Sequence, residues 1–367
     1  MASRLLDRSG VTSLGGVDPR PSPVAHLHLE DRHVATEPPE ARGLARSEVR
    51  LLVSSAVDRH EHTRFDRIGE HLRPGDVLAV NTSGTRNAAI DALLASGTPI
   101  VVHVSTELPG GLWTVEPRTP LAGGSTEPMA LRGGPLDVEL TGGASLHLLR
   151  PVAGSDRLWI AATDPGDDLL DALERHGRPI RYRYVPDDWP LDAYSSVFAL
   201  DHTSAEMPSA SRPFTAELVT HLVSSGVLIA PVSLHTGVSS LEGHEAPYPE
   251  WFSVPETTAD AVNAARANGG RVIAVGTTVV RALESAADRR GRLHPAEGWT
   301  DVVISPARGV QAVDGLFTGW HEPTASHIDM LLAVAPEPLL VEAYEQAWGA
   351  GYRWHEFGDS HLLLPTG

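Results

Sequence analysis

The local pattern of the chain changes near its middle, and this change limits the fold more than any other feature. Between residues 97 and 162, short runs of strand character alternate with turn clusters such as GG, GGST and GSD. Strands at this spacing predict an all-β module. The runs are Pro99–Val104, Leu112–Glu116, Leu136–Leu140, Ser145–Leu149 and Leu158–Ala161.

The second half of the chain alternates predicted helices with predicted strands. Residues 215–225 have helical spacing, with Thr215 as the N-cap and Gly226 just past the end. An apolar strand over 227–234 follows, and the alternation continues to a strand over 360–364. A buried strand over 77–81 precedes the β-rich stretch, after a helix over 64–72. This order predicts a layered α/β domain. The other predicted elements are helices over 257–268, 276–290, 324–334 and 338–348 and strands over 271–275 and 302–305.

Two amino acids are missing from the chain, and their absence excludes several kinds of chemistry. There is no Cys and no Lys, so all 29 basic residues are Arg. A thiolate nucleophile, a Cys-ligated zinc, a Lys Schiff base and a P-loop Lys are therefore excluded. Arg cannot replace Lys as a proton acceptor. Acid–base chemistry must fall to His, Asp, Glu or Tyr.

Charge and hydropathy indicate the binding partners and the cellular location to expect. The net charge of −18 gives no general attraction to phosphate backbones, although a local Arg-lined groove is compatible with it. No apolar run approaches the roughly 18 residues of a membrane span, and the first residues lack the apolar segment of a signal peptide. A cytoplasmic location is expected, and the sequence does not predict an oligomeric state.

A strand–turn–helix segment, RVIAVGTTVVRALES over 271–285, is the most informative local motif. The Gly276-Thr277-Thr278 turn would direct free N–H groups and the positive end of the helix dipole beyond the strand. Arg281 lies one turn further on, where it suits a carboxylate or phosphate. The alternative is a capped helix whose Arg pairs with a nearby acid, and the pattern does not distinguish the two.

Isolated polar residues in other segments are candidates for chemistry. His235 follows an apolar strand, which is where open α/β folds place ligands, although a lone His there is more often a structural hydrogen-bonding group. His321 precedes a predicted helix, and Asp359 lies in a tight turn before the last strand. His60-Glu61-His62 lies in a polar stretch and indicates a solvated surface rather than a metal site.

Six segments, in order along the chain, resemble motifs of the S-adenosylmethionine:tRNA ribosyltransferase-isomerase family of queuosine biosynthesis. GTTVVRALES, for example, is similar to the family's GTTSVRTLES, and LRPGDVLAVN to LRPGDLLVLN. The segments are Leu72–Asn81, Ser233–Gly237, Glu250–Val254, Gly276–Ser285, Val313–Pro323 and Tyr352–Leu362. The resemblance implies a larger α/β domain, residues 1–85 and 163–367, interrupted by a smaller β-barrel-like domain, residues 86–162. The site would lie mainly on the larger domain, facing the cleft.

The resemblance also implies a reaction. S-adenosylmethionine serves as a ribosyl donor: a base removes a C5′ proton beside the sulfonium, adenine leaves, and the aminomethyl group of 7-aminomethyl-7-deazaguanine in tRNA attacks. Epoxide formation then expels methionine and gives epoxyqueuosine. The partners are S-adenosylmethionine and tRNA, with no metal, other cofactor or membrane.

Residue chemistry and motif position suggest which side chains carry this reaction. His235 and His321 are the candidate bases, with Asp359 or Glu250 orienting one of them. Substrate binding is expected from the turn motif and three further residues. The expected binding residues are Gly276, Thr277, Thr278, Arg281, Asp314 and Arg353.

Two of the departures from the family pattern bear most on the usual substrate. Pro213 stands where the family has His, and Thr324 stands where it has Lys. Two alternatives therefore stay open: a diverged enzyme that uses S-adenosylmethionine on a small molecule, and a non-catalytic paralogue.

Overall fold

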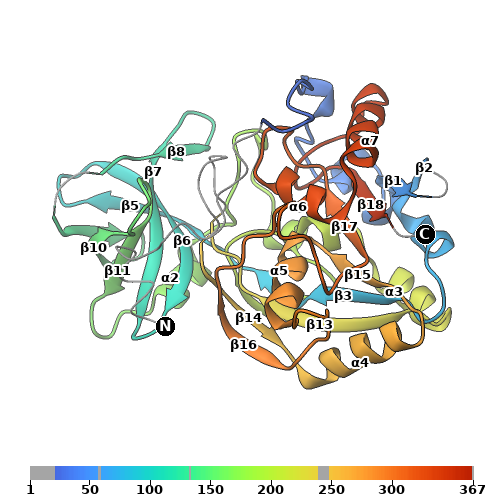
Figure 1. Ribbon diagram of the computed structural model, residues 1–367. Coiled ribbons are helices and arrows are strands. Elements are labelled where there is room, and N and C mark those ends of the chain that lie inside the picture. The colour runs from blue at the N-terminus through green and yellow to red at the C-terminus, as the bar shows by residue number, and fades with distance from the viewer. Residues whose placement is uncertain (1–20, 57–58, 132–133, 239–247, 366–367) are drawn as a thin grey trace.

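The protein has two lobes, a layered α/β lobe and a smaller β-barrel (Figure 1). The computed structural model describes residues 21–56, 59–131, 134–238 and 248–365. Both lobes are built on sheets, and a two-stranded parallel pair of β4 (Ser83–Thr85) and β12 (Asp201–Ser204) accompanies them.

A nine-stranded sheet forms the centre of the larger lobe, in the order β16-β14-β13-β3-β15-β17-β18-β1-β2. Strands β13, β3, β15 and β17 run parallel, so their carboxyl ends share one edge. Strand β18 is antiparallel to β17 but parallel to β1. The strands are β1 (Arg50–Ser55), β2 (Arg59–Arg64), β3 (Val77–Asn81), β13 (Leu228–Leu234), β14 (Glu250–Val254), β15 (Val272–Val275), β16 (Ala296–Thr300), β17 (Gly315–Gly319) and β18 (Ser360–Leu364).

Helices cover both faces of this sheet, and each face has its own apolar core. On one face, α4 (Glu256–Ala267), α5 (Thr277–Ala286), α6 (His327–Val334) and α7 (Glu337–Gly349) contribute to the larger core cluster. On the other face, α3 (Ala216–Ser224) and the 3-10 helix η4 (Phe65–His71) pack against the sheet. Every residue of β3 is buried, as expected for a central strand covered on both faces. Short 3-10 helices are η1 (Asp31–His33), η2 (Pro39–Arg42), η3 (Arg46–Glu48), η5 (Leu191–Tyr194) and η6 (Ser209–Ser211).

The smaller lobe is a closed six-stranded barrel with one further edge strand. Its sheet has the order β11-β10-β9-β5-β6-β7-β8, and β11 pairs back onto β7. Helix α2 (Leu169–His176) packs Leu169, Ala172 and Leu173 into the barrel core. The strands are β5 (Ala89–Leu94), β6 (Pro99–Leu108), β7 (Leu112–Pro120), β8 (Thr126–Pro128), β9 (Leu136–Leu140), β10 (Ser145–Pro151) and β11 (Trp159–Thr163).

The predicted fold class, an α/β lobe with a smaller β-barrel, is confirmed. Thr215 caps α3 as expected, its hydroxyl accepting a hydrogen bond from the Leu218 N–H. The predicted strand over 302–305 is wrong, and the edge strand is β16 instead, paired with β14. Residues 65–71 form a 3-10 helix, and α5 ends at Ala286 rather than at residue 290. The predicted domain limits at 86 and 162 stay predictions.

None of the helices in the described residues is both long and apolar enough to cross a membrane.

Candidate functional site

The carboxyl ends of the parallel strands face the barrel (Figure 1), and several of the predicted site residues follow these strands along the chain. His235 follows β13, Gly276 follows β15 and His321 lies two residues past β17. The loop after His235 touches the barrel, where the Val238 N–H donates to the Ser105 hydroxyl at 2.9 Å. Ligands of open α/β sheets bind at this edge, so it is the candidate site.

His235 is held through one ring nitrogen. Its Nδ1 lies 2.9 Å from the Ser83 hydroxyl and 2.7 Å from the Thr203 hydroxyl. The ring stacks on Trp251 with centroids 4.8 Å apart. Burial lowers the pKa of His235, which favours the neutral imidazole. Within the described residues Nε2 has no hydrogen-bond partner, so this nitrogen is available to accept a proton.

Glu250 and Arg281, predicted to act separately, form a buried ion pair. The other Glu250 oxygen accepts the Gly237 N–H at 3.0 Å, so Glu250 fixes the loop after His235 rather than the His235 ring. Burial raises the pKa of Glu250, while the Arg281 charge opposes that rise. Arg281 also donates to the carbonyls of Val302 and Thr300, at 3.2 and 3.3 Å. Arg281 therefore matches the alternative in which the helix Arg pairs with a nearby acid.

His321 lies deeper in the fold, beside a second histidine. Its ring stacks on His327, with centroids 4.4 Å apart and planes 4° from parallel. Its Nε2 is 2.9 Å from the Thr318 hydroxyl, so Thr318 orients the ring. Burial holds the pKa of His321 well below its usual range and lowers that of His327 to about 4. Both rings are therefore neutral near pH 7.

Three of the predicted site residues make contacts away from these histidines. Asp359 accepts the backbone N–H groups of Arg50 and Arg353, at 2.9 and 2.8 Å, and pairs with the Arg50 guanidinium. Asp314 precedes β17, at the opposite end of the sheet, where it accepts the Val272 N–H at 2.9 Å. Asp359 and Asp314 thus brace the backbone, and Arg353 contributes only its own N–H to the Asp359 carboxylate.

The Gly276 turn has the predicted strand-to-helix geometry. Gly276 has φ +102°, a conformation that favours glycine, and it is the N-cap residue of α5. Gly276 has no side chain, so no side-chain cap is made from the N-cap position of this helix. The first N–H groups of α5 are therefore left at the edge that faces the barrel, together with the positive end of the helix dipole.

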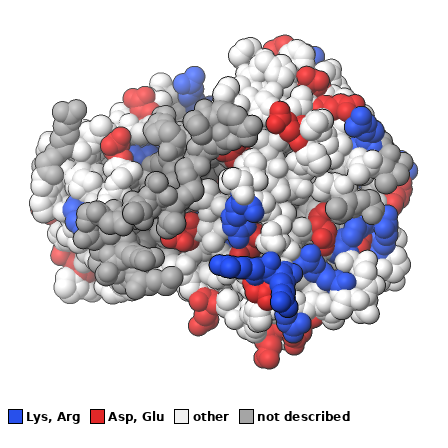
Figure 2. Space-filling model, in the orientation of Figure 1, with Lys and Arg blue, Asp and Glu red and all other residues white. Residues whose placement is uncertain are grey.

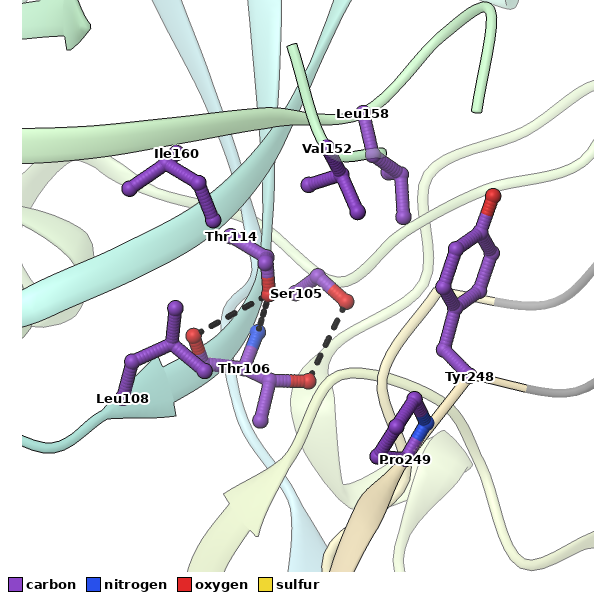
Figure 3. A pocket seen from close by; sticks show the side chains of 9 residues that line it. All are labelled: Ser105, Thr106, Leu108, Thr114, Val152, Leu158, Ile160, Tyr248 and Pro249. Carbon is purple, nitrogen blue, oxygen red and sulfur yellow. Dashed lines mark hydrogen bonds between the residues drawn. The ribbon is translucent and has the colours of Figure 1, made fainter. Parts of the chain in front are cut away.

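A cavity opens between the lobes beside this edge (Figure 3). Its volume is about 30 Å³, which is room for one or two water molecules. Tyr248 and Pro249 of the larger lobe face the barrel residues across it. Since Pro249 directly precedes Glu250, the cavity adjoins the Glu250–Arg281 pair. The barrel residues that line it are Ser105, Thr106, Leu108, Thr114, Val152, Leu158 and Ile160.

Comparison with known proteins covers both lobes. Residues 26–363 match the family model described as queuosine biosynthesis protein. The chain belongs to this family. It is 32% identical to the S-adenosylmethionine:tRNA ribosyltransferase-isomerase of Moorella thermoacetica, over 92% of this chain and 97% of that protein. It is 33% identical to the protein of the same name from Thermus thermophilus, with the same coverage.

A solved structure agrees with this assignment to the queuosine biosynthesis family. The crystal structure of S-adenosylmethionine tRNA ribosyltransferase from Thermotoga maritima superposes with a TM-score of 0.51 at 29% identity. The match covers 92% of this chain and 99% of that one. The two-lobed architecture is thus shared with this family member.

The departures from the family pattern lie in different environments. Pro213 is buried between Arg212 and Phe214, just before α3. Thr324 is exposed in the turn that leads to α6.

Among the described residues, no three His, Asp or Glu side chains come together as metal ligands, and the His60–His62 segment lies in strand β2.

Sequence reasoning missed one cluster near the junction. The Tyr184 hydroxyl donates to Glu356 at 2.6 Å, and the Tyr184 ring stacks on His355 with centroids 3.9 Å apart. Tyr182 donates to Glu206. Burial raises the pKa of Glu356 to about 7, and the charge of nearby Glu206 adds to that rise. These residues come from segments without regular periodicity, so no local pattern marked them.

Proposed function

We propose that this protein is an S-adenosylmethionine:tRNA ribosyltransferase-isomerase. It transfers and isomerises the ribosyl moiety of S-adenosylmethionine to the aminomethyl group of 7-aminomethyl-7-deazaguanine in tRNA. The products are epoxyqueuosine, adenine and methionine. The observation that carries the proposal is the match over 92% of the chain to enzymes of that name, which includes both lobes and the residues between them.

In this proposal His235 is the general base. Its neutral ring, anchored at Nδ1 by Ser83 and Thr203, presents Nε2 to the C5′ proton beside the sulfonium. Loss of that proton leaves electrons that support departure of adenine and then attack by the amine. His321 is the second candidate, but it is deeper and its Nε2 is engaged by Thr318.

The remaining expected residues take binding or positioning roles. The N–H groups of Thr277 and Thr278 suit the methionine carboxylate, because a helix N-terminus attracts anions. The Gly276 N–H is already engaged, since it donates to the Phe317 carbonyl at 2.8 Å. Arg281 and Glu250 position the loop after His235 through Gly237. Asp359 and Asp314 brace the strands, and the Arg353 N–H donates to the Asp359 carboxylate.

A tRNA substrate needs a basic surface on this acidic chain, and the turn after α5 offers one. Arg289, Arg290 and Arg292 are exposed, and none of them forms an ion pair within the described residues. Arg266 joins them through a 2.9 Å hydrogen bond to the Gly291 carbonyl. Figure 2 shows basic side chains gathered on the larger lobe. Ten residues of α5, about 15 Å of helix, separate this turn from Gly276, a distance that an RNA stem-loop can span.

The direct test is to incubate the protein with labelled S-adenosylmethionine and identify the products, with and without tRNA that carries 7-aminomethyl-7-deazaguanine. Adenine and methionine should appear only with that tRNA. Adenine release that ignores tRNA would instead favour an enzyme acting on a small molecule. Binding of S-adenosylmethionine without turnover would favour a non-catalytic paralogue. A tRNA-modifying enzyme would act where tRNA is, which we expect to be the cytoplasm.

A further inference from the structure

Arg86 carries a buried positive charge that no carboxylate neutralises within the described residues. It lies where the chain leaves β4 and enters the barrel, and only 7% of its surface is exposed. Its Nη2 donates to the carbonyls of Ser105 and Val104, at 2.8 and 3.5 Å, and its Nε is buried with no hydrogen-bond partner in the described chain. Burial lowers the pKa of Arg86 to about 10, so the guanidinium stays charged at neutral pH.

The other buried arginines show how unusual Arg86 is. Burying a charge is costly unless an opposite charge pairs with it. Six arginines of the described residues are buried, and five of them pair with a carboxylate, whereas Arg86 has only carbonyls and the face of the Trp113 ring, 5.3 Å away. The five paired arginines are Arg118 and Arg157, both with Glu116, Arg212 with Glu40, Arg271 with Asp76 and Arg281 with Glu250. A buried charge without such a partner is a candidate for a functional role.

The backbone of Arg86 is connected to His235 through hydroxyl groups. The Arg86 N–H donates to the Ser204 carbonyl at 2.9 Å. The Ser204 hydroxyl lies 2.7 Å from the Ser83 hydroxyl, which contacts Nδ1 of His235, and it also accepts the Thr236 N–H at 3.1 Å. Arg86 therefore belongs to the same hydrogen-bonded segment that holds the His235 ring.

The guanidinium of Arg86 is connected to the loop after His235 through a β-bulge. The pairing of β6 with β7 shifts register between Val104 and Thr106, which leaves Ser105 as the extra residue. Bulges redirect side chains and are frequent next to active sites. Arg86 holds the Ser105 carbonyl, and the Ser105 hydroxyl accepts the Val238 N–H at 2.9 Å. The loop is thus fixed on both sides by residues that Arg86 binds.

Few charges act on the His235 ring. On the segments packed around it, the described titratable groups are Asp201 and His202 of β12, Glu206 after β12, Glu250 beside Trp251 on β14, and Arg86 after β4. Three of these are engaged elsewhere, Glu250 by Arg281, Glu206 by Tyr182 and His202 by the Thr85 carbonyl. Burial lowers the pKa of His235, the Asp201 charge opposes this effect, and the Arg86 charge adds to it. Asp201 is exposed, so water screens its charge more strongly than that of buried Arg86.

We propose that Arg86 is a positioning residue for His235: its unpaired charge keeps the imidazole neutral, and its guanidinium holds the Ser105 bulge against the loop after His235. A positive charge near the ring disfavours the imidazolium, so the ring can accept a proton at a lower pH than burial alone would allow. The role rests on the proposed function, in which neutral His235 is the general base. It also gives a reason for a buried arginine without a carboxylate, because a carboxylate beside Arg86 would cancel its effect on the ring.

Three variants and one control separate the charge of Arg86 from its hydrogen bonds. Arg86→Met removes both, Arg86→Gln removes the charge but keeps an amide donor, and Arg86→Lys keeps the charge. Arg178→Gln is the matched control, because the charge of Arg178 is already paired with Asp91 of the barrel. The His235 ring is titrated by NMR in protein with labelled histidine, without substrates, and the signal that is missing from His235→Asn identifies it among the 18 histidines. Thermal unfolding shows whether each variant folds.

We expect the affinity of His235 for a proton to rise about three- to tenfold in Arg86→Met and Arg86→Gln, because the repulsion between two cations is removed. Arg86→Lys and Arg178→Gln should titrate like the wild type. If Arg86→Met unfolds, Arg86→Gln carries the test, since its amide can still donate to the carbonyls. A folded Arg86→Gln protein with wild-type titration would overturn the proposal. So would an equal rise in Arg86→Lys, because packing rather than charge would then control the ring.

The pH dependence of kcat/KM separates this inference from the proposed function. The pH below which kcat/KM falls should move upward in Arg86→Gln and return to the wild-type value in Arg86→Lys. A His235 titration that depends on Arg86, in a protein that never modifies tRNA, would reject the function and keep the electrostatic role. Modification of tRNA by Arg86→Gln with an unchanged titration and pH profile would keep the function and reject the role of Arg86.

Discussion

The Glu250 carboxylate and the Arg281 guanidinium pair with each other and join β14 to α5. Each group thereby neutralises the charge of the other in a buried place. Glu250 also accepts a hydrogen bond from the Gly237 N–H, and Arg281 also donates to the carbonyls of Val302 and Thr300. One ion pair thus fixes the loop after His235 and the edge strand β16.

Removal of one partner of this pair should cost more than removal of both. Arg281→Met leaves a buried carboxylate without its counter-charge, and we expect a loss of about 3–5 kcal/mol in the free energy of unfolding. Glu250→Gln should cost less, because the amide oxygen can still accept the Gly237 N–H. The double variant should recover part of the Arg281→Met loss. Urea unfolding of the four proteins measures this, and strictly additive losses would contradict the coupling.

His235→Asn should remove turnover and leave the fold intact. The shorter amide can still reach the Ser83 and Thr203 hydroxyls, but it has no proton acceptor at the Nε2 position, so we expect kcat to fall about 10²–10⁴-fold. Adenine release in the presence of tRNA measures this, and His321→Asn is the comparison. In the wild type, burial lowers the His235 pKa. As the pH drops, kcat/KM should therefore stay constant through the usual histidine range and fall only at a pH below that range. Activity of His235→Asn within a few-fold of wild type would exclude this role.

Glu356→Gln should change how stability depends on pH. The pKa of Glu356 is raised from 4.5 to about 7, so between these values the folded chain holds a proton that the unfolded chain releases. Stability contributed by this group is therefore present at low pH and declines as the pH rises from about 4.5 to 7, by up to about 3 kcal/mol. We expect the Gln variant to be more stable than wild type above pH 7 and to lack this decline. Thermal unfolding at several pH values tests it, with exposed Glu345→Gln as the control.

The arginine turn after α5 should determine how salt affects tRNA binding. Changing Arg289, Arg290 and Arg292 together to Ser should weaken tRNA binding and reduce the slope of log affinity against log salt concentration by about 2–3. Affinity for S-adenosylmethionine should not change. Arg175→Ser is the control, since Arg175 is an exposed residue of α2 paired with Asp171. An unchanged slope would show that the RNA lies elsewhere.

Much of the fold could be predicted because its central elements have strong local patterns. Strand β3 is apolar at four of its five positions and buried throughout, and α3 has both an amphipathic face and a Thr215 cap. Strand β2, in contrast, reads RHEHTR and has no apolar residue. It is a strand because it pairs with β1 and because His62 contacts Tyr352, a residue 290 positions away. Local periodicity does not contain such contacts.

The same distinction applies to the site. His235 could be found because it directly follows an apolar strand. Whether Arg281 would bind a substrate or pair with an acid depended on Glu250, which lies 31 positions earlier and reaches it only through the packing of β14 on α5. The Tyr184–Glu356 bond joins residues 172 positions apart, so neither residue could be recognised as part of a cluster from its own neighbours.

The bond between Arg50 and Asp359 has a consequence for how the protein is made. These residues are 309 positions apart, and they lie at the start of two neighbouring parallel strands, β1 and β18. During synthesis, the β1–β2 hairpin leaves the ribosome long before the strand that ties it to the rest of the sheet. The barrel, whose strands are contiguous from β5 to β11, has all its partners much earlier. A nascent chain would therefore hold a finished barrel beside an unpaired hairpin until β18 arrives, and during that interval the hairpin edge is exposed to chaperones and to aggregation.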